Sequence, residues 1–298
     1  MKQIVVLSGK GGTGKTSFLA SMAALAGESV LADCDVDASN LAILAGGLEG
    51  EEEPFFGEGV ARVDPDLCTL CGKCEESCRF GAISLPRGEE GRPAGPARVR
   101  EIACEGCGLC ALVCPGKAIS MEERRSGTLV VSRSRHGPIV HARLRPGEGN
   151  SGKLVAMVRE KAKGVAAERG LDLVLVDGSP GIGCPVISSL AAVDGAFLVV
   201  EPSVSALHDL ERILQLLERF RVRACLVLNK WDLHPAAGEE ILALCRERDV
   251  PRAGKIPFDP LFLDALLEGR SIVEYAPGSP PAAAVEDAWR EGRRILGF

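Results

Sequence analysis

The sequence predicts an α/β protein: a doubly wound, mostly parallel sheet into which a small α+β domain is inserted. Three observations support this fold class. Short apolar runs, suited to strands buried on both faces, alternate with segments of helical periodicity. A glycine-rich loop directly follows the first apolar run. A cysteine-rich stretch then interrupts the alternation, which divides the chain into the expected ranges 1–57, 58–122 and 123–298.

The alternation of strands and helices continues along most of the chain. The expected strands are 2–7, 29–33, 171–177, 195–200 and 222–228. The expected helices are 15–26, 153–168, 205–219, 237–248 and about 281–296. After the cysteine-rich stretch, residues 127–144 predict a hairpin, because the Ser-Arg-His-Gly at their middle is typical of a turn.

The composition is that of an ordinary globular protein. Of the 298 residues, 46% are hydrophobic and 26% are charged, which argues against disorder. A net charge of −6 and an aromatic content of 4% argue against a nucleic-acid-binding protein. No apolar run is long enough to span a membrane, so we expect no stable membrane insertion. The first residues lack the apolar stretch of a secretory signal, and we expect a cytoplasmic location.

The glycine-rich loop predicts a nucleotide site. Residues Gly9–Thr16 fit the pattern G-x-x-x-x-G-K-[ST], between a predicted strand and a predicted helix. Glycines let backbone N–H groups surround phosphate oxygens, and the helix dipole favours the same anion. In this motif Lys15 reaches the β- and γ-phosphates, and Thr16 binds Mg²⁺. The alternative is a glycine-rich turn without a ligand. We expect ATP and Mg²⁺ as cofactors.

A second lysine in the loop narrows the interpretation. Lys10-Gly11-Gly12-Thr13-Gly14-Lys15-Thr16 resembles the deviant phosphate loop of the MinD/ParA/nitrogenase-iron-protein superfamily of P-loop ATPases. The resemblance implies that Lys10 crosses a dimer interface to the partner's nucleotide. A solvated surface lysine is the alternative.

Two acidic segments carry the same resemblance. Asp33–Leu41 looks like switch I of the superfamily, which implies that Asp35 positions the attacking water. Its neighbours Asp33 and Asp37 have no definite role by this match. The apolar strand that ends at Asp177 has the shape of a Walker B motif, which implies that Asp177 holds Mg²⁺. Acids in solvated loops at strand ends are the alternative.

The remaining nucleotide residues follow from the resemblance alone. Gly178–Gly181 resembles switch II, Asn229 resembles the adenine-recognition asparagine, and Pro257 lies in a segment that resembles the second base-contacting loop. The expected catalytic residues are Asp35, Lys10 and Lys15. The expected ATP-binding residues are Gly9, Lys10, Gly11, Gly12, Thr13, Gly14, Lys15, Thr16, Ser17, Asn229 and Pro257. The expected Mg²⁺ ligands are Thr16 and Asp177.

A repeat of cysteines predicts two metal clusters. Of the twelve cysteines, eight form two runs of spacing C-x2-C-x2-C-x3-C, which match the bacterial two-cluster ferredoxin pattern. In that pattern the fourth cysteine of each run serves the other cluster. One [4Fe–4S] cluster is therefore expected on Cys68, Cys71, Cys74 and Cys114. The other is expected on Cys104, Cys107, Cys110 and Cys78. Zinc is the alternative, although its sites typically use pairs of C-x-x-C knuckles.

Three functions agree with a MinD-superfamily ATPase that carries an inserted ferredoxin domain. The first is Mg-ATP hydrolysis by a nucleotide-dependent dimer, coupled to electron transfer through the two clusters. The second is ATP-dependent assembly or delivery of iron–sulfur or mixed-metal cofactors, although carriers of this type use a C-x-x-C that does not occur after Cys114. The third is a MinD-like positioning ATPase. The expected partners are a second ATPase chain, identical or similar, and a redox or metallocofactor protein.

Overall fold

The computed structural model describes residues 1–47, 49–88, 91–149 and 151–298. The chain divides into two compact units. The first comprises Met1–Glu53, Leu129–Arg143 and Asn150–Phe298, and the second comprises Pro54–Thr128 and Leu144–Gly149. The insert expected at 58–122 lies within the second unit.

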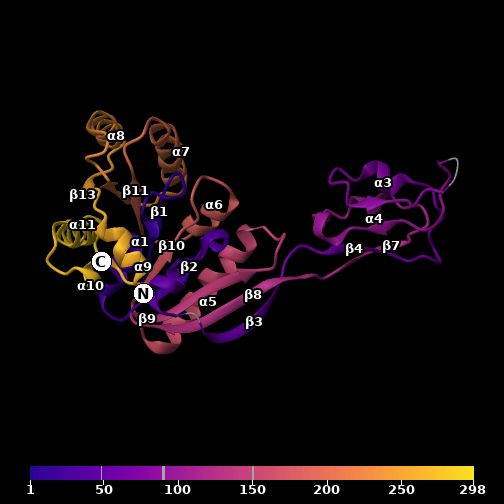
Figure 1. Cartoon of the computed structure of the whole chain (residues 1–298), viewed down its shortest axis with the longest axis horizontal. Helices are drawn as coiled ribbons and strands as arrows, with labels where there is room; N and C mark the ends of the chain where they lie inside the picture. The colour runs from indigo at the N-terminus through magenta and orange to yellow at the C-terminus, as the bar shows by residue number, and fades with distance from the viewer. Residues whose placement is uncertain (48, 89–90, 150) are drawn as a thin grey trace. The chain divides into compact units, whose positions relative to one another are not determined.

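A single sheet forms the centre of the first unit (Figure 1). In the described part of the chain it has nine strands, in the order β13-β12-β11-β1-β10-β2-β9-β8-β3. The strands are β1 Lys2–Leu7, β2 Val30–Asp33, β3 Gly50–Phe56, β8 Arg125–Ser134, β9 Gly137–Leu144, β10 Leu173–Asp177, β11 Gly195–Val200, β12 Ala224–Asn229 and β13 Arg252–Ile256. Neighbours from β13 to β9 run parallel, and β8 with β9 forms the predicted hairpin. The mostly parallel α/β fold predicted from the sequence is confirmed.

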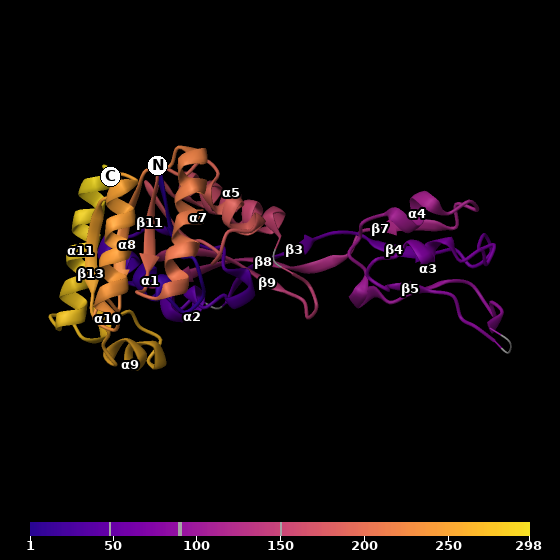
Figure 2. The same cartoon turned by 90° about the horizontal axis from the view of Figure 1, so that it is seen from above.

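Helices cover this sheet in two groups. The first contains α1 Lys15–Ala26, α2 Leu41–Ala45, α10 Ile272–Tyr275 and α11 Pro280–Leu296, which pack on one another. The second contains α5 Gly152–Arg169, α6 Cys184–Leu190, α7 Val204–Phe220 and α8 Pro235–Glu247, each in contact with the next. Figure 2 shows α7 and α8 side by side. The long helices lie where the sequence predicts them, to within two residues at each end.

Burial on both faces of the sheet explains the continuous apolar strands. β1 is buried from Gln3 to Leu7, and every residue of β11 and β12 is buried. On one face, the Phe197 ring of β11 lies 5.5 Å from Phe18 of α1 and 6.1 Å from Trp289 of α11, centroid to centroid. Trp289 and its apolar neighbours on α11 therefore belong to the core of the first unit.

Several short elements were not predicted from the sequence. They are α2, β3, α6, β13, α9 Leu261–Leu267 and α10. Elements of four to seven residues are too short to show a helical period, and β13 (Arg-Ala-Gly-Lys-Ile) lacks a continuous apolar run. Their conformation depends on the sheet and helices against which they pack.

The register of the sheet brings three strand ends together. In the parallel pairs, Val6 lies opposite Asp177, and Asp177 lies opposite Asp33. The residues that follow β1, β10 and β2 therefore meet at one edge of the sheet. Parallel α/β sheets bind their ligands at this edge, beyond the carboxyl ends of the strands.

The second unit is small and contains two similar halves, one for each cysteine run. Its helices α3 Lys73–Ser77 and α4 Leu109–Val113 occupy equivalent places in the two cysteine runs. Strand β4 Val60–Val63 pairs with β7 Ile119–Glu122, and β5 Ile83–Ser84 pairs with β6 Arg98–Val99, both antiparallel. Its buried core consists of Ala61, Cys74, Ile83, Leu85, Ala97 and Ile119, with further cysteines packed against it.

Candidate functional site

The phosphate loop connects β1 to α1. Gly14 caps the helix in a left-handed conformation with φ 90°, and a Cβ there would lie 2.4 Å from the amide nitrogen of Asn229. Only glycine meets both constraints. By contrast, a Cβ at Gly11 would have open space around it. The first N–H groups of α1 are thus presented at the loop, where they and the helix dipole favour an anion.

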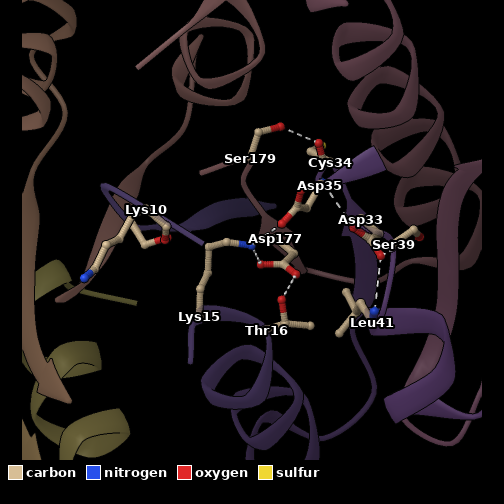
Figure 3. Close-up of polar contacts among 11 residues, drawn as sticks. Lys10, Lys15, Thr16, Asp33, Cys34, Asp35, Ser39, Leu41, Asp177 and Ser179 are labelled. Carbon is tan, nitrogen blue, oxygen red and sulfur yellow. Dashed lines mark hydrogen bonds and ion pairs between the residues drawn. The ribbon is translucent and has the colours of Figure 1, made fainter. Parts of the chain in front are cut away.

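Lys15 lies at the centre of a buried polar group. Its ammonium nitrogen is 2.6 Å from Oδ1 of Asp177 and 3.3 Å from Oδ2 of Asp35. The hydroxyl of Thr16 donates to the other oxygen of Asp177 over 2.7 Å. Figure 3 shows these side chains converging from α1, the end of β10 and the segment after β2. Residues far apart in the sequence therefore meet where the phosphate-loop motif requires a phosphate and a metal ion.

Carboxylates outnumber the ammonium group in this site. Burial and the charge of Asp177 raise the pKa of Asp33 to about 7. Burial also raises the pKa of Asp35, in spite of the nearby Lys15. Burial would lower the pKa of Lys15, but the charges of Asp177 and Asp35 outweigh it and raise that pKa. A divalent cation beside Thr16 and Asp177 would offset the excess negative charge, so these residues fit the expected Mg²⁺.

Asp33 holds the segment that carries Asp35. Its carboxylate accepts hydrogen bonds from the backbone N–H of Asp35, the hydroxyl of Ser39 and the backbone N–H of Leu41. A second tie joins this segment to the one after β10, because Ser179 donates to the carbonyl of Cys34 over 2.6 Å. The predicted switch I and switch II segments are therefore in direct contact (Figure 3).

Two adjoining cavities extend from the phosphate loop. One of about 1010 Å³ is lined by residues 11–17, Asp35 and Pro180, among others. The other, of about 1060 Å³, is lined by Asn229, Pro257 and Phe258, among others. Gly12, Gly14 and Ser17 border both. The expected ATP-binding residues of the phosphate loop therefore lie beside Asn229 and Pro257.

Lys10 does not join the buried group around Lys15. Its ammonium nitrogen lies 2.7 Å from Oε1 of Glu201 and donates to the hydroxyl of Ser203 over 3.1 Å. Figure 3 shows the side chain pointing away from Lys15. The structure therefore separates the two lysines of the motif into different surroundings.

The two cysteine runs border two cavities. The first cysteine cavity is lined by Cys68, Cys71, Cys74 and Cys114, among others. The second cysteine cavity is lined by Cys78, Cys104, Cys107 and Cys110, among others. Each cavity thus combines three cysteines of one run with the last cysteine of the other.

The backbone around the two cavities repeats as well. Equivalent residues of the runs share left-handed conformations, namely Leu70 with Gly106 (φ 60° and 64°), Gly72 with Gly108 (78° and 73°), and Gly81 with Lys117 (59° and 49°). The sulfurs of Cys78 and Cys114 each accept a backbone N–H from four residues later, over 3.3 Å. Left-handed turns of this kind aim N–H groups at a common anion, as they do at many phosphate and iron–sulfur sites.

These cavities do not resemble a site for one ion. Among the described residues, no three His, Cys, Asp or Glu side chains converge closely enough to hold a single metal ion. Apolar residues also line the cavities, for example Val63 in the first and Met121 in the second. The [4Fe–4S] clusters expected on these cysteines therefore stay a prediction.

Comparison with known proteins identifies the family. A model of the CobQ/CobB/MinD/ParA nucleotide-binding domain matches residues 4–272. The chain belongs to this family. An uncharacterised protein of Methanocaldococcus jannaschii, MJ0578, is 35% identical over 231 residues, which cover 76% of this chain and 78% of the relative. An uncharacterised ATP-binding protein of the same organism, MJ0547, is 22% identical over 291 residues, 95% of this chain and 84% of the relative.

Solved structures agree with the family at the level of fold. The septum site-determining protein MinD of Pyrococcus horikoshii, complexed with Mg-ADP, superposes with a TM-score of 0.59 at 21% identity, covering 99% of this chain and 97% of that one. An ATP complex of a Cyanothece McdA variant gives a TM-score of 0.58 at 14% identity, covering 100% and 97%. At these identities the likeness concerns the fold alone. The MinD/ParA resemblance of the phosphate-loop part is confirmed.

Sequence reasoning missed Glu201 in this CobQ/CobB/MinD/ParA-family chain, and it gave Asp33 no role. Glu201 directly follows an apolar strand, as Asp177 does, and that position was the available signal. Its partners Lys10 and Lys230, however, follow other strands.

No helix of the described residues combines the length and apolar character that a membrane span requires.

Proposed function

We propose that this chain hydrolyses Mg-ATP as a nucleotide-dependent dimer, and that hydrolysis is coupled to electron transfer through two [4Fe–4S] clusters in its second unit. Membership of the nucleotide-binding family supports the first half. The second half depends on one observation: each cysteine cavity takes three thiols from one run and the fourth from the other. Two unrelated zinc knuckles give no reason for that exchange.

The roles of the nucleotide residues follow from their contacts. When ATP binds, the Lys15 ammonium exchanges Asp177 and Asp35 for the β- and γ-phosphates. That exchange frees Asp177, which with Thr16 would hold Mg²⁺. Asp35 then faces the γ-phosphate, where a carboxylate can orient the attacking water. Asp33 keeps the segment in place through its three hydrogen bonds.

The cysteine cavities would supply one-electron chemistry. A cluster on Cys68, Cys71, Cys74 and Cys114, and another on Cys104, Cys107, Cys110 and Cys78, would each accept and release a single electron. Apolar residues line both cavities, and the backbone N–H groups at Cys78 and Cys114 would stabilise thiolate charge. Both factors tune a reduction potential.

The comparisons favour a second candidate, a MinD-like positioning ATPase. They include MinD proteins of Pyrococcus horikoshii and Pyrococcus furiosus and a putative septum site-determining protein MinD of Nephroselmis olivacea. The C-terminal helix α11 gives no membrane-binding face for that role, because Val285, Ala288 and Trp289 are buried in the core. The carrier hypothesis has less support outside the runs, where Cys34, Cys225 and Cys245 are buried and Cys184 is exposed without a neighbouring C-x-x-C.

Iron analysis and redox titration together test the proposal. Anaerobically prepared protein should contain about eight iron atoms per chain, four for each cluster. Adding Mg-ATP should shift the reduction potential of the clusters. The matched control is Lys15→Ala, which should keep its iron but show no shift. The wild-type protein could instead have its full iron content while ATP changes neither the cluster potential nor electron transfer to a redox partner. In that case the proposed coupling is wrong.

A further inference from the structure

Three adjacent strands bring two lysines and a glutamate together. Lys10 follows β1, Glu201 directly follows β11, and Lys230 directly follows β12. β11 lies between β1 and β12 in the sheet, so the three residues meet at its carboxyl edge. One oxygen of Glu201 lies 2.7 Å from Lys10, and the other lies 3.0 Å from Lys230. The carboxylate therefore bridges both ammonium groups.

The two lysines are held differently. Lys230 also donates to the carbonyl of Gly12 over 3.0 Å, which ties it to the phosphate loop. The second contact of Lys10 is the hydroxyl of Ser203, a weaker acceptor than a carboxylate. Burial would raise the pKa of Glu201, but its hydrogen bonds with Lys10 and Lys230 lower it, so the Glu201 carboxylate is ionised at neutral pH.

We infer that Glu201 is a positioning residue that holds Lys10 against its own chain and competes with a partner's phosphate for it. The inference rests on the proposed dimer, in which Lys10 reaches the partner's nucleotide. To reach that phosphate, Lys10 must exchange a carboxylate for a phosphate oxygen. Lys230 makes the exchange feasible, because it stays with Glu201 and keeps a counter-charge beside the partly exposed carboxylate. Glu201 thus lowers the apparent affinity of ATP-dependent dimerisation.

The test is the dimer dissociation constant of the full-length chain, measured by sedimentation with a saturating non-hydrolysable ATP analogue and Mg²⁺. Glu201→Gln keeps the size of the side chain but removes its charge. It should dimerise about twofold to fivefold more tightly, the range expected for a partly exposed ion pair. Ser203→Ala removes the weaker acceptor and should tighten the dimer less. Lys230→Met removes the second cation of Glu201, so that Lys10 becomes its sole ammonium partner in the bridge. Lys10 should then be held more tightly, and the dimer should be weaker.

Two outcomes distinguish the inference from the function on which it rests. If Lys10→Ala abolishes ATP-dependent dimerisation while Glu201→Gln leaves the constant unchanged or weaker, with a wild-type unfolding temperature, then the role of Glu201 is wrong and the dimer stands. If Lys10→Ala dimerises like the wild type, the role of Lys10 across the interface is wrong, and the inference falls with it. Opposite shifts for Glu201→Gln and Lys230→Met are the result that supports it.

Discussion

At the scale of single residues, the site assigns different tasks to acids that look alike in the sequence. Asp33, Asp35 and Asp37 alternate along one short segment. Asp33 is fully buried and accepts three hydrogen bonds, which fix the backbone. Asp35 faces Lys15, whereas Asp37 is exposed at the border of the cavity. The chemistry therefore depends on Asp35 and the geometry on Asp33.

Asp35→Ala should separate ATP binding from hydrolysis. The variant keeps the phosphate loop and the Asp177–Thr16 contact, so its affinity for Mg-ATP should stay within a few-fold of the wild type. Its hydrolysis rate should fall by about 100-fold or more, because the water loses its positioning group. Equilibrium binding and a phosphate-release assay measure the two effects. Asp37→Ala is the matched control and should hydrolyse normally; an Asp35→Ala protein with the wild-type rate would refute the assignment.

Lys15→Ala should weaken both ATP binding and the fold. Without the ammonium group, the phosphates lose their cation, and Asp177 is left as a buried carboxylate without its ion pair. Removing one partner of a buried pair costs about 3 kcal/mol or more of unfolding free energy. The loss should shrink as the pH falls, because burial raises the pKa of Asp35 and of Asp33, so that these carboxylates take up protons and the site needs less counter-charge. Denaturant unfolding at two pH values checks this sign.

At the scale of elements, the turn from β1 into α1 depends on where glycine is indispensable. Gly14 has a left-handed backbone, and a Cβ there would collide with Asn229. Gly11 has neither restriction. The motif does not distinguish its glycines from one another. The fold, however, requires glycine at position 14 and not at position 11.

Gly14→Ala should abolish ATP binding, and Gly11→Ala should leave the fold intact. The first substitution adds backbone strain of about 1 kcal/mol or more and displaces Asn229 from its hydrogen bond to Thr13. The second adds a methyl group in open space. Thermal unfolding and nucleotide binding of the two variants provide the comparison. Equal behaviour of the two proteins would contradict the loop geometry.

Each cysteine cavity needs a residue from both cysteine runs to complete its set of four cysteines. Cys114 belongs to the second run but borders the first cysteine cavity, and Cys78 does the reverse. Cys114→Ser should therefore disturb the cluster of Cys68, Cys71 and Cys74. Cys110→Ser should disturb the other cluster. Iron content and electron paramagnetic resonance of both variants distinguish the two losses; identical spectra from the two variants would argue against the crossed assignment.

At the scale of the whole molecule, the chain passes repeatedly between its two units. It crosses within β3 and β8, and again after Arg143 and Gly149. The crossing strands belong to the sheet that carries the nucleotide residues at its edge. Chain connectivity of this kind is a physical route for coupling, provided that the nucleotide binds two arrangements with different affinity.

Coupling between the units should be reciprocal. If Mg-ATP shifts the cluster potential, reduction of the clusters must change ATP affinity by the same factor. A one-electron shift of about 59 mV corresponds to a tenfold change in affinity. ATP affinity measured on oxidised and on reduced protein should therefore agree with the potential shift measured by titration. Lys15→Ala, which should not bind ATP, controls for direct effects of the reductant.

Much of the fold and part of the site could be predicted before the structure. Asp177 and Lys15 were expected from local motifs, and the structure brings them to 2.6 Å. Long strands and helices were predicted because their periodicity extends over many residues. Short elements such as α2, β13 and α9 were not, because tertiary packing rather than local pattern determines them. The second unit was expected from its cysteines, and the iron they would bind stays a prediction.

The sequence by itself determined what depends on short stretches of chain: the phosphate loop, the buried strands and the spacing of the two cysteine runs. Only the tertiary structure decided which distant side chains are neighbours. Glu201 bridges Lys10 and Lys230 because β11 lies between β1 and β12, and parallel strands align their carboxyl ends at one edge. Strand order is a property of the whole sheet, and no local pattern encodes it.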